Sequence, residues 1–184
     1  MEFRLYYRGP LKSNGNIEHK HAIREQIHQQ LKHLWNQRPL SDLKDKLLSG
    51  QHELGCIRPL EGFVFAPLVQ SRIDLIADID ITLLRPEEPG AIVTQAGDID
   101  NRLKTLLDAL RMPQKRSEIP SKCKPETTDT PFFCLLEDDN LITALKVTTD
   151  RLLDSVSSPS EVVLILHVHT KVTRATLFNL GLGI

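Results

Sequence analysis

The sequence has few cysteines, no long apolar run and no excess of charge of either sign, and each shortage excludes a class of protein. Its three cysteines are Cys56, Cys123 and Cys134. They are widely spaced without metal-ligand pairing, and an odd number without a signal peptide is typical of a reducing compartment. We therefore expect free thiols.

Apolar segments are also too short for a membrane protein. No run approaches the ~18 apolar residues that a spanning helix needs. The opening residues, Met1–Leu5, lack the apolar core of a signal peptide. These absences predict a cytoplasmic protein with no membrane partner.

Positive charge is not in excess, since 23 Lys and Arg stand against 24 Asp and Glu, a net charge of −1. A dedicated nucleic-acid binder usually has a clear positive excess. Any DNA contact must therefore come from local clusters. Internal repeats, a glycine-rich phosphate loop, a nucleophile elbow and a Cys-x-x-Cys motif are all absent.

What is present suits one globular domain of 184 residues, with 40% hydrophobic and 26% charged residues. Apolar spacing of three and four predicts a long helix over 17–37 and a second over 99–110. Alternation of apolar and acidic residues predicts a strand over 73–84. We expect a single α+β domain: a mixed, mostly antiparallel sheet of four to six strands with two main helices packed on it.

The remaining segments complete this expected fold. Pro67 favours an edge position for the strand 63–69, and the largely apolar strand 161–172 is expected to be central. The other expected elements are a strand at 3–7, a helix at 41–48, a loop at 51–59, an extended piece at 91–95, apolar runs at 132–136 and 141–148, a helical turn at 150–156 and an apolar tail at 177–184 that suits an oligomer contact.

The stretch 97–111 carries the main chemical signal. Asp98 and Asp100 stand at the entrance of the predicted amphipathic helix, where the helix dipole favours negative charge. Lys104 follows four residues after Asp100, so its ammonium can fold back toward the carboxylates. A second acidic cluster, Glu137-Asp138-Asp139, separates two strand-like runs.

This order resembles the RusA-like Holliday junction resolvase family, with its Asp-x-Asp-Asn-x-x-Lys at a helix start, Leu-Asp-Ala-Leu in that helix and a later Asp-Asp pair before a strand. The resemblance covers roughly 97–148. The matching residues are Asp98, Asp100, Asn101, Lys104, the run Leu107–Leu110, and Asp138-Asp139 followed by Ile142.

The resemblance implies a Mg²⁺-dependent, structure-selective endodeoxyribonuclease that cuts branched DNA as a homodimer. By position, the catalytic carboxylates would be Asp98, Asp100 and Asp139, assisted by Lys104. Asp138 would join the three acids in holding Mg²⁺ or Mn²⁺. Converging carboxylates also suit this chemistry on their own terms, because Mg²⁺ prefers oxygen ligands and can activate a water molecule.

Local structural roles remain open for each acid. Asp98 can be a plain helix cap, Asp100 a first-turn acid paired with Lys104, and Asp138-Asp139 a solvated turn. The strand acids Asp78 and Asp80 either face solvent or supply an extra ligand, if their face borders Asp98.

Cations for DNA binding are expected in two places. The approach to the 99–110 helix carries Glu87 and Glu88, with Arg85 the only cation nearby, where the family has arginines. The segment 112–131 is a polar insertion relative to the family and is either a phosphate-tracking loop or an exposed tether. The expected contacts are Lys115, Arg116, Lys122 and Lys124 in the insertion, and Lys20 and Arg24 on the first helix.

Two histidine groups have alternative readings. His19, His21, His28 and His33 on the first helix suit a solvated polar face, with a zinc site as the alternative. His167 and His169 project from one side of a strand. They are either packed or hydrogen-bonded imidazoles, or metal ligands for which the neighbouring sequence offers no third partner.

Three other functions remain open. The chain could be a phage- or defence-associated nuclease with another DNA substrate, or a RusA-like domain that binds DNA or protein without cutting. It could also be an unrelated interaction domain with a chance acidic motif. In the last case Asp98, Asp100 and Asp139 would lie more than ~10 Å apart, too far for one ion.

Overall fold

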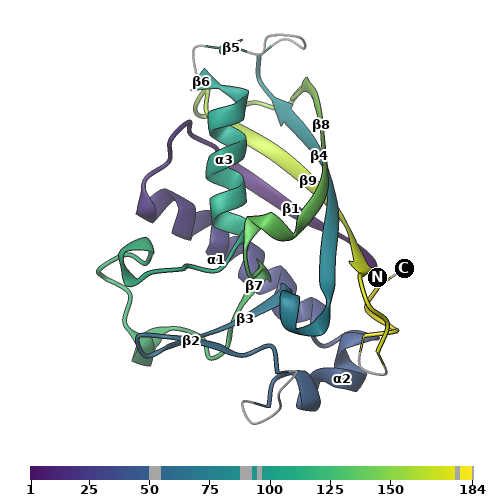
Figure 1. Ribbon diagram of the computed structural model, residues 1–184. Helices are drawn as coiled ribbons and strands as arrows, with labels where there is room; N and C mark the ends of the chain where they lie inside the picture. Colours follow the sequence, from purple (N-terminus) through teal and green to yellow (C-terminus); the bar gives the residue numbers. More distant parts are fainter. Residues whose placement is uncertain (50–54, 88–92, 95–96, 177–178, 184) are drawn as a thin grey trace.

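The computed structural model describes residues 1–49, 55–87, 93–94, 97–176 and 179–183. Within them the chain forms an α+β fold with three α-helices, a four-stranded mixed sheet and a three-stranded sheet (Figure 1). The predicted fold class is confirmed, while the second sheet was not expected.

The larger sheet has the strand order β1-β9-β4-β8. Its strands are β1 (Glu2–Pro10), β4 (Leu75–Arg85), β8 (Ile142–Arg151) and β9 (Glu161–Val172). β9 pairs antiparallel with both β1 and β4, so its predicted central place is confirmed. β8 pairs parallel with β4 and forms an edge of the sheet.

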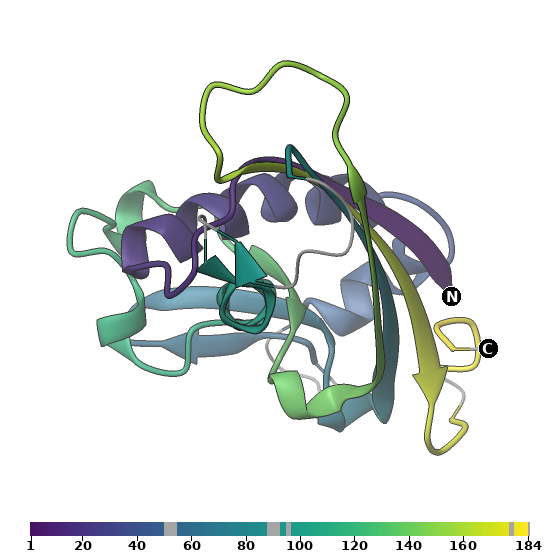
Figure 2. The same ribbon diagram turned by 90° about the horizontal axis from the view of Figure 1, so that it is seen from above.

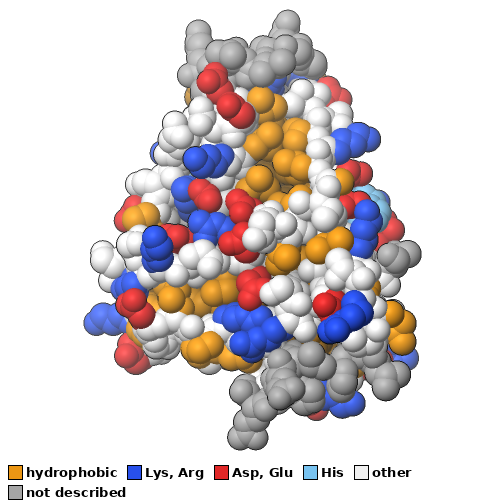
Figure 3. Space-filling view, in the orientation of Figure 1, with side chains coloured by type: hydrophobic (Ala, Val, Ile, Leu, Met, Phe, Trp, Pro, Cys, Tyr) orange, Lys and Arg blue, Asp and Glu red, His pale blue; other side chains and the backbone are white. Residues whose placement is uncertain are grey.

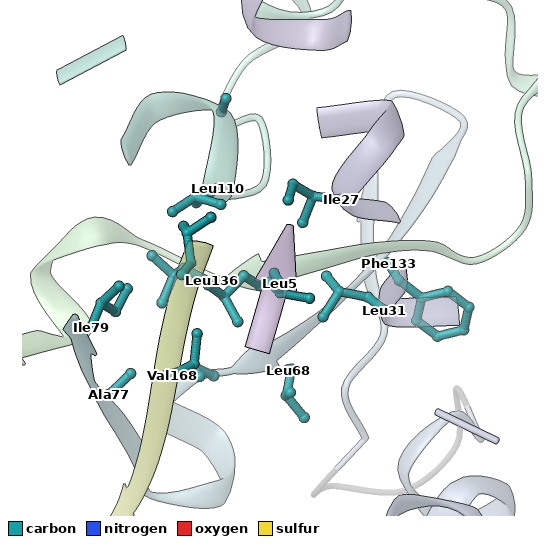
Figure 4. Packing of buried hydrophobic residues seen from close by; sticks show 14 of the residues in the cluster. Leu5, Ile27, Leu31, Leu68, Ala77, Ile79, Leu110, Phe133, Leu136 and Val168 are labelled. Carbon is teal, nitrogen blue, oxygen red and sulfur yellow. The ribbon is translucent and has the colours of Figure 1, made fainter. Parts of the chain in front are cut away.

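One face of this sheet is buried and the other is open. In β4 the side chains alternate between buried and more exposed positions, as the sequence alternation predicts. Figure 2 shows the sheet curving around α1 (Ile17–Leu34) and α3 (Ile99–Leu110). The core between them includes Leu5, Ile27, Ile79, Leu110 and Val168 (Figure 4).

The smaller sheet has the order β2-β3-β7, with β2 (Arg58–Leu60), β3 (Phe63–Val69) and β7 (Phe132–Leu136). Glu61 and Gly62 form the tight turn of the β2–β3 hairpin, with φ of 44° and 87°. The prediction of an edge position for β3 is wrong, because β3 is the middle strand. β2 reaches only as far as Phe65, so Pro67 lies beyond the β2 ladder.

The insertion 112–131 packs against the smaller sheet. It contains two short 3₁₀ turns, η2 (Arg116–Glu118) and η3 (Pro125–Thr127). Met112 and Ile119 are buried in a cluster with Phe63, Phe65, Phe132 and Cys134. The tether alternative therefore does not describe this segment.

Several local predictions differ from the structure. Residues 58–60 form a strand instead of a loop because the hairpin turn places them against β3. Asp150 and Arg151 continue β8, since their backbones pair with the end of β4, and no helical turn follows at 152–156. The short helix α2 (Leu40–Leu47) has Pro39 at its N-cap position, whereas Ser41 was predicted to cap it, so the helix begins and ends earlier than predicted.

Other predictions fall partly outside the described residues. Of the extended piece at 91–95, only β5 (Val93–Thr94) is described, and it pairs with β6 (Gly97–Asp98). Of the apolar tail, 177–178 and 184 lie outside. No described helix is long and apolar enough to cross a membrane. Cys56, Cys123 and Cys134 are free thiols.

Candidate active site

The N-terminal end of α3 presents two carboxylates and a lysine. Asp98 occupies the N-cap position, but its side chain makes no capping hydrogen bond. Asp100 is exposed, and its Oδ1 accepts a 2.9 Å hydrogen bond from the Asn101 N–H. Lys104 is exposed one turn further along. Within the described part of the chain no ion pair occupies these three side chains, and Asp100 and Lys104 are exposed while Asp98 is half-buried.

The rest of α3 is held by the first helix and the loop before it. The Gly15 N–H donates to Thr105 Oγ1 over 3.0 Å, and Ser13 Oγ donates to the Asp98 carbonyl over 3.2 Å. At the other end, buried Arg24 donates to the carbonyls of Asp108 and Arg111. These contacts fix the helix that carries the acids.

In the second acidic cluster, each of the three residues has a different environment. Arg58 Nε donates to Glu137 Oε1 over 2.7 Å, and the Ser71 N–H donates to Oε2 over 3.0 Å. Burial alone raises the pKa of Glu137, but the hydrogen bonds and charge of Arg58, together with Ser71, lower it overall. Glu137 is therefore a structural anchor.

The next two residues, Asp138 and Asp139, make fewer interactions than Glu137. Asp138 caps the 3₁₀ turn η4 (Asp139–Leu141) by accepting a 3.0 Å hydrogen bond from the Asn140 N–H. Asp139 is exposed, and no described residue donates a hydrogen bond to its carboxylate. Asp139 is thus the member of this cluster most available to a ligand.

The two acidic groups lie at opposite ends of α3 (Figure 1). Leu136 pairs with Arg111 in an isolated bridge, and its carbonyl accepts a 2.8 Å hydrogen bond from Met112, just past the C-terminal end of α3. Asp138 and Asp139 follow Leu136 directly. Twelve helical residues span about 18 Å. One chain therefore does not gather Asp98, Asp100 and Asp139 around a single ion.

Glu87 is a carboxylate near the N-terminal end of α3 to which the sequence analysis gave no ligand role. Its Oε1 lies 3.3 Å from Arg102 Nη2, and its Oε2 is buried with no hydrogen-bond partner among the described residues. No spacing signal in the sequence connects Glu87 with this helix. Asp98, Asp100 and Glu87 are hard oxygen donors of the kind that Mg²⁺ prefers.

Three of the expected DNA contacts have structural partners. Arg24 is only 2% exposed, so its burial contradicts the expected phosphate contact. Lys20 Nζ lies 2.7 Å from Asp108 Oδ2. Arg116 stacks over Phe63 and donates to the carbonyls of Ile119 and Cys123. The exposed cations of the insertion are Lys115, Lys122 and Lys124.

Only His33 of the four α1 histidines is exposed, and His19 is partly buried, so the predicted solvated face does not form. His21 and His28 are buried. His28 Nδ1 accepts a 2.8 Å hydrogen bond from the Phe133 N–H, so its Nε2 carries the proton directed at Asp129. His21 Nε2 lies 3.3 Å from Cys123 Sγ at a cavity of about 720 Å³ between α1 and the insertion.

The strand acids are also remote from the ends of α3. Asp78 Oδ1 accepts a 2.6 Å hydrogen bond from Thr143, and Lys171 forms an ion pair with its other oxygen. Asp78 and Asp80 occupy the open face of the sheet, opposite the buried face on which α3 packs. They therefore supply no extra ligand to Asp98.

Comparisons with family models, curated proteins and solved structures give no match for this chain.

Proposed function

We propose that the chain is a metal-dependent endodeoxyribonuclease of the RusA-like type, acting on branched DNA as a homodimer. Three observations support it: accessible Asp98 and Asp100 at the positive end of α3, exposed Lys104 one turn away, and exposed Asp139 after β7. Among the described residues Asp98, Asp100, Lys104 and Asp139 take part in no ion pair, whereas Glu137 is held by Arg58.

The distance between the two acidic groups makes a second copy necessary. If two α3 helices lie antiparallel across a two-fold axis, the Asp98 end of each copy meets the Asp139 end of the other. Such a dimer would build two equivalent carboxylate sites from the acids that one chain keeps about 18 Å apart. This separation within one chain is the main reason for proposing a dimer.

An apolar strip beside α3 offers a surface for that association. Figure 3 shows hydrophobic side chains gathered between α3 and β8. Leu145 of β8 is 42% exposed and pairs in register with buried Ile79, so it lies on the face that carries α3. Leu103 and Leu107 of α3 are only partly buried. A self-complementary apolar surface of this kind suits a two-fold interface.

Each residue then has a defined task. Asp98 and Asp100 of one copy, with Asp139 of the other, would hold Mg²⁺ or Mn²⁺. Bound there, the ion would activate water and stabilise charge on the phosphodiester. Lys104 would hold the scissile phosphate beside the carboxylates, as a compact cation does. The exposed Lys115, Lys122 and Lys124 would contact DNA away from the cut.

Nicking of labelled DNA tests the activity. Four-way, flap and linear duplexes are incubated with wild type, Asp98→Asn and the control Asp45→Asn, whose acid is exposed on α2. We expect nicks that need Mg²⁺ or Mn²⁺, persist in Asp45→Asn and disappear in Asp98→Asn. Nicks that survive Asp98→Asn, or none on any substrate, would overturn the proposed function.

The separation of the carboxylates also favours one rival, an unrelated interaction domain with a chance acidic motif, and it is compatible with a second, a RusA-like domain that binds DNA without cutting it. In the second case a gel-shift assay would show binding of branched DNA by wild type, and the metal ions would produce no nicks.

A further inference from the structure

We propose that Glu2, His167 and His169 form a structural binding site for a zinc-class divalent ion on the open face of the larger sheet. Among the described residues, this is the one group of three or more His, Cys, Asp or Glu whose ligand atoms all lie within 4.8 Å of one another. The proposed site does not rest on the nuclease activity.

The sheet register brings the three residues together. Glu2 of β1 is paired with His169 of β9, and Arg4 is paired with His167. His167 and His169 are two apart in one strand, so both imidazoles project from the same face. Their neighbours Leu166 and Val168 are buried on the other face. The strand backbones therefore hold all three ligands without help from a loop.

The ligand atoms lie close enough for one ion to bridge them after side-chain adjustment. Glu2 Oε1 lies 2.5 Å from His167 Nε2, and Glu2 Oε2 lies 3.8 Å from His169 Nδ1. Ligand atoms of a tetrahedral zinc site stand about 3.4 Å apart, given metal bonds near 2.1 Å. Small side-chain rotations would open the first contact and close the second.

The donor chemistry selects the class of ion. Two imidazoles and one carboxylate suit Zn²⁺, Co²⁺ or Ni²⁺ better than Mg²⁺, which prefers oxygen ligands. On the same face, Asp80 of β4 is exposed and paired with His167, so it is a candidate for a fourth ligand.

His169 distinguishes a metal site from a simple ion pair. The Glu2–His167 hydrogen bond needs no third partner, and 3.8 Å is too long for His169 to contribute a hydrogen bond. Removing the His169 imidazole should therefore leave that bond intact while deleting one metal ligand.

Metal titration of the chelator-stripped full chain tests the site. Zn²⁺ binding is followed by calorimetry and Co²⁺ binding by visible absorption. We expect one ion per chain, a higher melting temperature with Zn²⁺, and affinity at least about tenfold weaker in His169→Gln and in Glu2→Gln. The matched control His33→Gln removes an exposed imidazole on α1 and should bind as wild type does.

Three results would overturn this site. The first is wild-type affinity in His169→Gln, and the second is no saturable binding below about 1 mM metal. The third is binding that is lost in Cys123→Ser, which would place the ion beside His21 instead. Melting curves without metal show whether each variant is folded. If His169→Gln is unfolded, Glu2→Gln replaces it as the test variant.

Discussion

Arg24 donates a 2.9 Å hydrogen bond from Nη2 to the main-chain oxygen of Asp108, near the C-terminal end of α3. A second bond runs from its Nε to the Arg111 carbonyl over 3.2 Å. Helix carbonyls at this end have no partner within the helix. A buried cation from α1 therefore caps the helix that carries the candidate carboxylates.

Arg24→Met should remove this cap and lower the free energy of unfolding by about 3 kcal/mol, because two partly buried carbonyls lose a charged donor. Urea denaturation at neutral pH measures the change. Lys115→Met removes an exposed cation and should leave stability unaltered. An Arg24→Met protein as stable as wild type but weaker in DNA binding would instead restore the phosphate-contact role.

Glu137 should give the protein a pH-dependent component of stability. Its pKa in the folded chain lies below the ordinary value of 4.5 because of Arg58 and Ser71. A depressed pKa contributes stability that is present above pH 4.5 and is lost as pH falls through the folded value. Glu137→Gln should thus cost about 1–3 kcal/mol at pH 7 and progressively less in acid.

Urea unfolding of wild type and Glu137→Gln, compared from pH 7 to pH 3, checks this. The other acids titrate in both proteins, so the difference between them isolates Glu137. A difference that stays constant over the whole range would show that the Arg58–Glu137 ion pair does not set the pH dependence.

Elements with one buried face could be predicted, because the spacing of their apolar residues is a local property of the sequence. The alternation in 73–84 and the helical spacing in 99–110 each reflect burial of one face, so β4 and α3 were both predictable to within about two residues. The sequence patterns did not predict the burial of side chains whose hydrogen-bond partner lies far away along the chain. His28 is buried because it hydrogen-bonds the backbone of Phe133, 105 residues away, and a helical wheel does not contain that contact.

In the candidate site, too, local spacing predicts some positions and tertiary packing sets the others. Asp98, Asp100 and Lys104 share a helix end because their spacing requires it. The place of Asp139 depends on how β7 passes the end of α3, which no local pattern specifies. Likewise, the neighbouring sequence of His167 and His169 offered no third ligand, because Glu2 arrives from another strand.

Leu145 offers a direct test of the dimer surface. Leu145→Glu should place a charge in the apolar strip between α3 and β8, giving folded monomers that lose nicking activity. Their melting temperature should be somewhat lower than that of the wild-type dimer and independent of protein concentration, because association no longer stabilises the fold. The control is Leu153→Glu, since Leu153 is 90% exposed outside the strands. Sedimentation measures the oligomeric state of all three proteins. A monomeric wild type, or a dimeric Leu145→Glu protein, would contradict the proposed interface.

Mixed dimers test whether each site uses acids from two chains. Asp100→Asn and Asp139→Asn dimers should each be inactive yet as stable as wild type or more so, because clustered carboxylates repel without their ion. Chains carrying the two substitutions are co-expressed with different tags, and the mixed dimer is purified. One of its sites then holds both lesions and the other holds none.

The nicking rate of that mixed dimer is the most direct measurement of the proposed arrangement. Shared sites predict about half of the wild-type rate, and almost none when a wild-type chain is paired with the double variant Asp100→Asn, Asp139→Asn. The opposite pattern, an inactive mixed dimer and a half-active pair with the double variant, would show that each chain completes its own site.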